Sequence, residues 1–197
     1  MSLLGEGGRM NFPNKKYQII YADPPWEYED KLTGGKVWGS VENHYSTMSL
    51  TDICNLPVNQ ISDKNCMLFI WGTWPKLPEV LQVIESWGFL YRTTAFVWVK
   101  TFNGKFHRGM GRWTRSNSEF CLLAKKGKIP RHSKRISQLL VSEIRGHSKK
   151  PDVVRNKILE LVGDLPRIEL FARTKIHGWD VWGNDEKLEN TPLESWF

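Results

Sequence analysis

The feature that most constrains this chain is residues 17–26, YQIIYADPPW, an apolar run that ends in an acid, two prolines and a tryptophan. The apolar residues are nearly continuous, which is typical of a strand covered on both faces of a sheet. Proline donates no hydrogen bond to a sheet ladder, so two consecutive prolines predict that the strand stops at Asp23. Asp23 is therefore predicted at the carboxyl end of a buried strand, where open α/β sheets bind their ligands.

The residues after this strand combine groups suited to a planar amine. The carboxylate of Asp23 and the carbonyl of Pro24 can accept hydrogen bonds from an exocyclic amino group, while Trp26 stacks on the attached ring. The fixed backbone angles of Pro24 and Pro25 would hold these groups rigidly. We therefore interpret residues 23–26 as the active site. The alternative, an ordinary Asp-Pro turn with Trp26 in the core, is about equally compatible with the motif taken alone.

Length and composition predict one domain in a reducing compartment. A chain of 197 residues with 40% apolar residues and 10 tryptophans can form one large core, and we expect residues 11–197 to be a single domain. Three widely spaced cysteines without metal-ligand spacing predict free thiols and no structural zinc. With neither a signal peptide nor a transmembrane run, the chain is expected to be cytoplasmic.

The first ten residues differ in character from the rest. They are glycine-rich and aperiodic, so we expect residues 1–10 to be a disordered leader. The run GEGGR is what a purine-rich ribosome-binding sequence encodes when it is read in frame, which makes Met10 the predicted natural start.

Strands and helices alternate along the chain. Helical patterns follow Ser49, which resembles a capping residue, and Pro75, which is expected in a first helical turn that leads to a helix ending at Gly88. Strands are predicted at residues 66–71, 94–100, 119–124, 139–144, 167–171 and 179–182. This alternation predicts an α/β fold with a doubly wound sheet.

The positive charge indicates a polyanionic partner. The formal net charge is +7, and residues 101–118 carry lysines and arginines interleaved with aromatic residues, which suits phosphate contact together with base stacking. Residues 125–135 are equally basic but lack aromatic residues, so a solvated basic surface is an equal alternative there. Residues 27–48 are polar and glycine-containing and read as a lid over the acceptor, in which His44 and Tyr45 either touch substrate or pack the loop.

A second set of polar residues is predicted at the same sheet edge as Asp23. Pro151 is expected at the first position of a helix, which places Lys150 at the N-cap, where a cation is unfavourable. Such an ammonium beside free helix N–H groups would form an anion pocket, and the alternative is a loosely capped turn. Arg173 and Asn184 each follow a predicted strand, and Glu169 is an acid inside an apolar strand. Neither a dinucleotide-binding glycine motif nor a P-loop is present.

Several short pieces now resemble one family when taken in order. They are ADPPW at 22–26, YSTM at 45–48, LFIW at 68–71, WVKT at 98–101, EFCL at 119–122, EIR at 143–145, KKPD at 149–152, IELFAR at 168–173 and WGN at 182–184. This set resembles the catalytic, seventy-kilodalton-type (MT-A) subunit family of mRNA adenosine methyltransferases. The resemblance implies a Rossmann-like, mostly parallel sheet of the class I methyltransferase type with the catalytic half before the cofactor half. It also implies S-adenosylmethionine as methyl donor and the 6-amino group of adenine as acceptor.

The resemblance also implies roles for individual residues. The catalytic set is Asp23, Pro24, Pro25 and Trp26. The implied donor-binding residues are Asp23, Lys150, Glu169, Phe171, Arg173, His177 and Asn184. The implied acceptor-binding residues are Tyr45, Arg112, Trp113, Asn117 and Arg145. No metal is implied.

The chain departs from the family pattern at two places. No acid directly precedes Tyr17, and the family's His-Asn pair after Arg173 is absent, with His177 as the candidate substitute. The acid-Pro-Pro-Trp motif is intact, which favours an enzyme over a catalytically silent nucleic-acid-binding partner. The small size, the lack of a separate recognition domain and the bacterial or phage character of the leader favour DNA over RNA as the acceptor, and RNA remains the alternative. The sequence does not indicate an oligomeric state.

Overall fold

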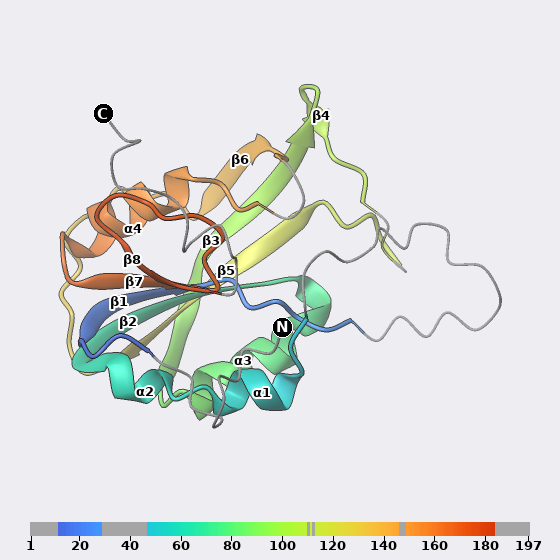
Figure 1. Ribbon diagram of the computed structural model, residues 1–197. Coiled ribbons are helices and arrows are strands. Elements are labelled where there is room, and N and C mark those ends of the chain that lie inside the picture. The colour runs from blue at the N-terminus through green and yellow to red at the C-terminus, as the bar shows by residue number, and fades with distance from the viewer. Residues whose placement is uncertain (1–11, 29–46, 110, 112, 146–148, 184–197) are drawn as a thin grey trace.

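The computed structural model describes residues 12–28, 47–109, 111, 113–145 and 149–183 (Figure 1). Its strands are β1 (Tyr17–Ala22), β2 (Ser62–Gly72), β3 (Leu90–Phe102), β4 (Lys105–Phe106), β5 (Ser118–Lys126), β6 (Leu139–Glu143), β7 (Arg167–Leu170) and β8 (Asp180–Trp182). Its helices are α1 (Leu50–Asn55), α2 (Val58–Ile61), α3 (Leu77–Ser86) and α4 (Val153–Val162), with a 3₁₀ turn η1 (Trp74–Lys76) before α3. The predicted leader and the predicted start at Met10 lie outside these residues.

All eight described strands form one sheet. Their order is β4-β3-β5-β2-β1-β7-β8, and β6 pairs with β3. β1 is parallel to β2 and β7, and β8 is parallel to β7, whereas β5 is antiparallel to both β2 and β3. β3 therefore runs in the same direction as β1, and β6 runs parallel to β3. Only β4 and β5 are reversed among the described strands, so the prediction of a mostly parallel sheet is confirmed.

Helices cover both faces of the sheet, as predicted for a doubly wound fold (Figure 1). The first face packs against α1, α2 and α3, and its core includes Ile20 of β1 and Val83 of α3. The second face packs against α4, and its core includes Ile19 of β1 and Ile158 of α4. Consecutive isoleucines of β1 thus fill opposite cores, because successive side chains of a strand point to opposite faces. This is why the strand reads as a continuous apolar run.

The helices on the first face follow their local sequence signals. Ser49 caps α1, with its hydroxyl oxygen accepting a hydrogen bond from the backbone N–H of Asp52 at 3.1 Å. Pro75 lies in η1 rather than in α3 itself, so the predicted helix begins a few residues later than expected. Gly88 follows α3 with φ of +75°, the left-handed conformation that commonly ends a helix.

The start of α4 differs from the prediction. The helix begins at Val153 with Asp152 as its N-cap residue, so Lys150 is not the cap and Pro151 is not the first helical residue. The carboxylate of Asp152 accepts hydrogen bonds from Arg155 and pairs with Arg145 instead of capping backbone N–H groups. Lys150 therefore lies two positions before the N-cap residue, and the prediction that it caps the helix is wrong.

Residues 101–106 form a hairpin that we did not predict. β3 continues to Phe102 and turns through Asn103 and Gly104, which have φ of +48° and +71°. An Asn-Gly pair with two positive φ angles is the preferred two-residue hairpin turn, because its twist matches that of the strands. In Figure 1 this hairpin projects from the body of the sheet at β4. Among the described residues, no helix is long and apolar enough to cross a membrane.

Candidate active site

Four charged side chains of alternating sign form a chain at one edge of the sheet. The Lys150 ammonium lies 2.8 Å from Asp23 Oδ2 and 3.4 Å from Glu119 Oε2. Glu119 in turn accepts a hydrogen bond from Lys100 Nζ at 2.5 Å through its other oxygen. The order Asp23, Lys150, Glu119, Lys100 therefore alternates negative and positive charge, and we call these four residues the charge chain.

Sheet topology brings the charge chain together. Asp23 directly follows β1, and Lys100 lies near the end of β3, which runs in the same direction. Glu119 is the second residue of β5, and because β5 is reversed, its beginning lies at the edge where β1 and β3 end. Lys150 lies in the connection that precedes α4. Residues from four separate parts of the chain thus meet at the carboxyl edge of the parallel strands, the expected place for a ligand.

Burial makes these charges depend on one another. The side chains of Lys150 and Glu119 are only 10% and 9% exposed, while that of Asp23 is 24% exposed. Burial acts to lower the pKa of Lys150, but the carboxylates of Asp23 and Glu119 outweigh it and raise that pKa above the ordinary lysine value. Burial likewise acts to raise the pKa of Glu119, and the two lysines outweigh it and lower that pKa. Lys150 and Glu119 are therefore both charged near neutral pH.

The two prolyl carbonyls each already accept one hydrogen bond. Pro24 O accepts from the backbone N–H of Trp26 at 2.9 Å, and Pro25 O accepts from the backbone N–H of Met48 at 2.9 Å. Residues 29–46, which include His44 and Tyr45, lie outside the described residues. A carbonyl oxygen has two lone pairs, so each prolyl carbonyl retains the capacity to accept a further donor.

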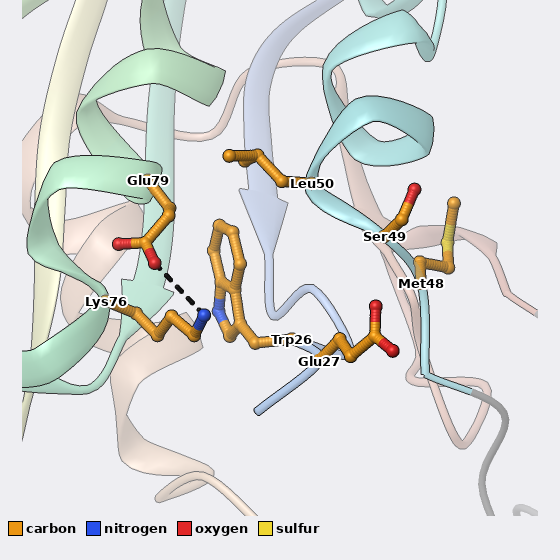
Figure 2. Close-up of a pocket in the computed structure, with 7 residues that line it drawn as sticks. All are labelled: Trp26, Glu27, Met48, Ser49, Leu50, Lys76 and Glu79. Atoms are coloured by element: carbon orange, nitrogen blue, oxygen red, sulfur yellow. Dashed lines mark hydrogen bonds and ion pairs between the residues drawn. The ribbon is translucent and has the colours of Figure 1, made fainter. Parts of the chain in front are cut away.

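Trp26 packs in the core and also lines a cleft. Its side chain is buried at 8% exposure and belongs to the core under α1 and α3. Its indole N–H donates to the carbonyl of Trp71 at 3.2 Å. Figure 2 shows the indole standing between Leu50 of α1 and the Lys76–Glu79 pair near α3. Trp26 therefore anchors the segment that carries Asp23.

A cleft of about 430 Å³ lies beside Trp26. Its walls include a Lys76–Glu79 ion pair with an N–O distance of 3.0 Å, and this volume is within the range of small-ligand sites. The residues that line it are Trp26, Glu27, Met48, Ser49, Leu50, Lys76 and Glu79. Trp26 belongs to the core of the first face, whereas Lys150 lies over the ring of Trp71, which belongs to the core of the second. The Asp-Pro-Pro-Trp segment thus links the two faces at the sheet edge.

The end of β7 adds a strained backbone position to this region. Phe171 follows the strand with φ of +60°, an uncommon conformation for a residue with a bulky side chain. Its ring makes an edge-on contact with Trp182 at a centroid distance of 5.6 Å, and the N–H of Ala172 donates to the Trp182 carbonyl. Strained backbone positions are frequent at ligand sites. Arg173 is half-buried and His177 is exposed, while Asn184 lies outside the described residues.

Glu169, which the resemblance placed among the donor-binding residues, forms a buried ion pair. Its carboxylate accepts hydrogen bonds from Arg155 Nε at 2.7 Å and from Arg155 Nη2 at 2.8 Å. Burial raises the pKa of Glu169, and Arg155 opposes this shift. The guanidinium also lies over the ring of Tyr21, at 5.7 Å from its centroid. The pair therefore joins α4 to β7 and β1.

Three of the predicted acceptor-binding residues, Trp113, Asn117 and Arg145, lie in the part of the chain that the structure describes. Trp113 is fully exposed, and Asn117 is half-buried, with its carbonyl accepting from the N–H of Lys100. Arg145 pairs with Asp152 at 2.9 Å beside the start of α4, and Arg112 lies outside the described residues.

Sequence reasoning did not single out two members of the charge chain. Glu119 and Lys100 belong to the matching pieces EFCL and WVKT, but the resemblance assigns neither of them a role. The available signal was an acid at the start of an otherwise apolar strand, the same signal that drew attention to Glu169.

Comparison with known proteins places these features in a family. The MT-A70 family model matches residues 17–185. The chain is 40% identical to the Type II methyltransferase M.MunI of a Mycoplasma species, over 90% of this chain and 82% of that protein. It is 28% identical to the N(6)-adenosine-methyltransferase MT-A70-like protein of Drosophila melanogaster, over 80% of this chain and 24% of that protein. It is 27% identical to the N(6)-adenosine-methyltransferase catalytic subunit METTL3 of Homo sapiens, over 80% of this chain and 26% of that protein.

The chain thus spans most of one relative and about a quarter of the length of two others. The matched region contains the sheet from β1 to β8 and the whole charge chain. The chain therefore belongs to the MT-A70 family of class I methyltransferases and is an S-adenosylmethionine-dependent enzyme that methylates the N6 amino group of adenine in nucleic acid.

Proposed function

We propose that the acceptor of this methyltransferase is adenine in DNA, and that Asp23 and Lys150 form the centre of its donor site. The observation that carries the site proposal is the 2.8 Å contact between the Lys150 ammonium and the Asp23 carboxylate at the carboxyl edge of the sheet. Two opposite charges side by side match the methionine part of the donor, which carries both an ammonium and a carboxylate. The residues of this edge therefore fit S-adenosylmethionine.

Within the proposed donor site, each residue has a chemical role. Lys150 would pair with the donor carboxylate, and Asp23 would accept from the donor ammonium. Arg173, beyond β7, would contact the donor ribose, and the turned backbone at Phe171 would form the floor beside it. Glu119, itself paired with Lys100, would hold Lys150 and keep it charged.

On the acceptor side the protein positions the amine and excludes water. Bound S-adenosylmethionine supplies a methyl group already activated by a sulfonium. The carboxylate of Asp23 and the remaining lone pair of the Pro24 carbonyl would accept the two N–H groups of adenine N6 and hold the nitrogen in line for transfer. Trp26, buried and bonded to Trp71, fixes the prolines relative to the sheet. A strong general base is unnecessary, because the methylated ammonium is acidic enough to lose its proton afterwards.

The choice of DNA rests on charge and on the pattern of similarity. A net charge of +7 suits either nucleic acid. Identity is higher to the Type II methyltransferase, at 40% over most of both chains, than to proteins named for adenosine, a ribonucleoside, at 27% to 28% over a quarter of their length. RNA is the second candidate, because those adenosine methyltransferases match the same region of this chain.

One transfer experiment tests this proposal. The purified chain is incubated with labelled S-adenosylmethionine and either duplex DNA or RNA, and the products are digested to nucleosides for mass spectrometry. We expect N6-methyldeoxyadenosine from DNA, and little N6-methyladenosine from RNA. A product only in the RNA arm would overturn the choice of acceptor. Label on cytosine or on protein would overturn the adenine assignment itself.

We also propose that residues 11–197 form one methyltransferase domain that works in the reducing cytoplasm. The family match from 17 to 185 and the single sheet support the first statement. Free thiols at Cys54, Cys66 and Cys121 support the second. Intact-mass measurement of the protein from its original host tests the natural start, and non-reducing peptide mapping tests the thiols. A disulfide between any two of these cysteines would contradict the assigned compartment.

A further inference from the structure

The hairpin of β3 and β4 presents two exposed aromatic side chains. Phe102 is 55% exposed and Phe106 is 66% exposed. Large apolar side chains at a projecting tip are costly to leave in water, and they mark surfaces that contact another molecule. The hairpin is also firmly held, because Gly104 N–H donates to Glu143 Oε1 at 3.3 Å and His107 N–H donates to the Lys100 carbonyl at 2.8 Å. Its phenylalanines are therefore presented on a stable ribbon.

The two phenylalanines point to opposite faces of this ribbon. In the strand register, Phe102 pairs with Lys105 and Thr101 pairs with Phe106. Paired residues of antiparallel strands share a face, so Phe102 and Phe106 lie on different faces. The two aromatic rings can therefore contact two apolar groups at once, one on each face of the ribbon. The base pairs that flank a step of duplex DNA present such a pair of surfaces.

The positive charge around the hairpin favours a polyanionic partner. Residues 101–143 contain ten lysines and arginines and two acids, Glu119, whose carboxylate is buried in the charge chain, and Glu143, whose carboxylate accepts from Gly104 N–H. Lys105, Arg108 and Arg115 are exposed, and none of them makes an ion pair within the part of the chain that the structure describes. An apolar partner surface on another protein would leave these cations without counter-charges. The phosphates of DNA supply them.

The hairpin begins at the candidate active site. Residue 101 directly follows Lys100, the last member of the charge chain that leads through Glu119 and Lys150 to Asp23. β3 and β1 are separated by β5 and β2, which corresponds to about 14 Å at the usual strand spacing of roughly 4.8 Å. The hairpin therefore extends from the same sheet edge at which Asp23 lies.

We propose that the β3–β4 hairpin enters duplex DNA beside the target adenine, where Phe102 and Phe106 wedge between the neighbouring bases and so favour extrusion of the adenine. This inference rests on the proposed function. Chemistry on a base requires that it leave the stack, at a cost of unstacking and unpairing. Apolar side chains inserted between base steps offset this cost in proteins that kink DNA.

The test compares two duplexes that differ in the cost of extrusion. Both contain the sequence that the wild-type chain methylates, one with the target adenine paired to thymine and one with it opposite an abasic site. For Phe102→Ala/Phe106→Ala we expect kcat/KM on the paired duplex to fall by about tenfold to a hundredfold, which corresponds to loss of stacking worth roughly 1–3 kcal/mol. On the abasic duplex we expect most of this loss to disappear, because extrusion no longer requires a broken base pair.

Leu90→Ala is the matched control, since Leu90 is an equally exposed apolar residue at the opposite end of β3. It is expected to leave kcat/KM unchanged on both duplexes, and thermal melting checks that all variants fold. An equal loss on both duplexes, or no loss on the paired one, would overturn the wedge. A change in oligomeric state of the double variant, measured by light scattering, would instead identify the hairpin as a contact between copies. If the proposed function is wrong, the wild-type chain will methylate neither duplex, and this outcome is distinct from failure of the wedge proposal.

Discussion

The ammonium of Lys150 lies 2.8 Å from the carboxylate of Asp23, although 127 positions separate the two residues in the chain. Asp23 follows the first strand, and Lys150 precedes the last described helix. Their contact joins the catalytic motif of the amino-terminal half to the elements that would hold the donor in the carboxyl-terminal half. Changes at either residue are therefore expected to affect both the donor and the acceptor.

Replacing Lys150 with alanine should weaken donor binding. The variant loses one charge-assisted hydrogen bond, worth about 1.5–3 kcal/mol, or roughly tenfold to a hundredfold in affinity. Isothermal calorimetry with S-adenosylmethionine measures this. The control is Lys149→Ala, which removes the neighbouring, half-exposed lysine that lies 3.6 Å from Asp152. Equal affinity losses in the two variants would contradict a specific role for Lys150.

Replacing Trp26 should act mainly through stability. Trp26→Ala removes a buried indole and should reduce the free energy of unfolding by about 3–5 kcal/mol. Trp26→Phe should cost less, because it removes the hydrogen bond to Trp71 but keeps much of the packing. Urea denaturation followed by fluorescence gives both values. If Trp26→Ala unfolds like the wild type but transfers no methyl groups, Trp26 is a base-stacking residue after all.

The Arg155–Glu169 pair provides a double-mutant test. Arg155→Met leaves a buried carboxylate without its partner and should destabilise the protein by about 3–5 kcal/mol, whereas Arg155→Met with Glu169→Met should recover most of this. Chemical denaturation of the wild type, both single variants and the double variant completes the cycle. Donor affinity of the folded double variant then separates two roles for Glu169. An affinity close to that of the wild type indicates a structural ion pair, and a large loss indicates direct donor contact.

Glu119 should make the free energy of unfolding decrease at acid pH. Lys150 and Lys100 hold its pKa in the folded protein below the ordinary glutamate value of about 4.3. Because the pKa of Glu119 is lower in the folded protein than in the unfolded chain, its ionised carboxylate stabilises the fold. This stabilisation is fully present above the unfolded-state pKa and is lost as pH falls through the folded-state pKa. The stability difference between wild type and Glu119→Gln should therefore shrink below about pH 4.3. Glu160→Gln, at an exposed position of α4, is the control, and a difference that grows in acid would refute the assignment.

Local sequence signals were sufficient for most elements of the fold. The continuous apolar run of residues 17–22, the Ser49 cap and the positive-φ glycine at 88 are each read from a few neighbouring residues, and all three are confirmed. The Asn-Gly turn of the hairpin is an equally local signal that was not used in the prediction. Such features depend on backbone geometry within a short segment, so no tertiary information is required.

The sequence by itself determined the α/β fold, the carboxyl-edge position of Asp23 and the family. Only the tertiary structure decided the partners of each charge. Lys150 was expected at the cap of a helix, but a reversed β5 carries Glu119 to the same edge, and the ammonium contacts this buried carboxylate as well as the half-buried carboxylate of Asp23. The packing of Trp26 in the core with residues of α1 and α3 was likewise visible only in the tertiary structure. Pairing and burial depend on residues far apart in the chain, and neither spacing nor composition records which of them meet.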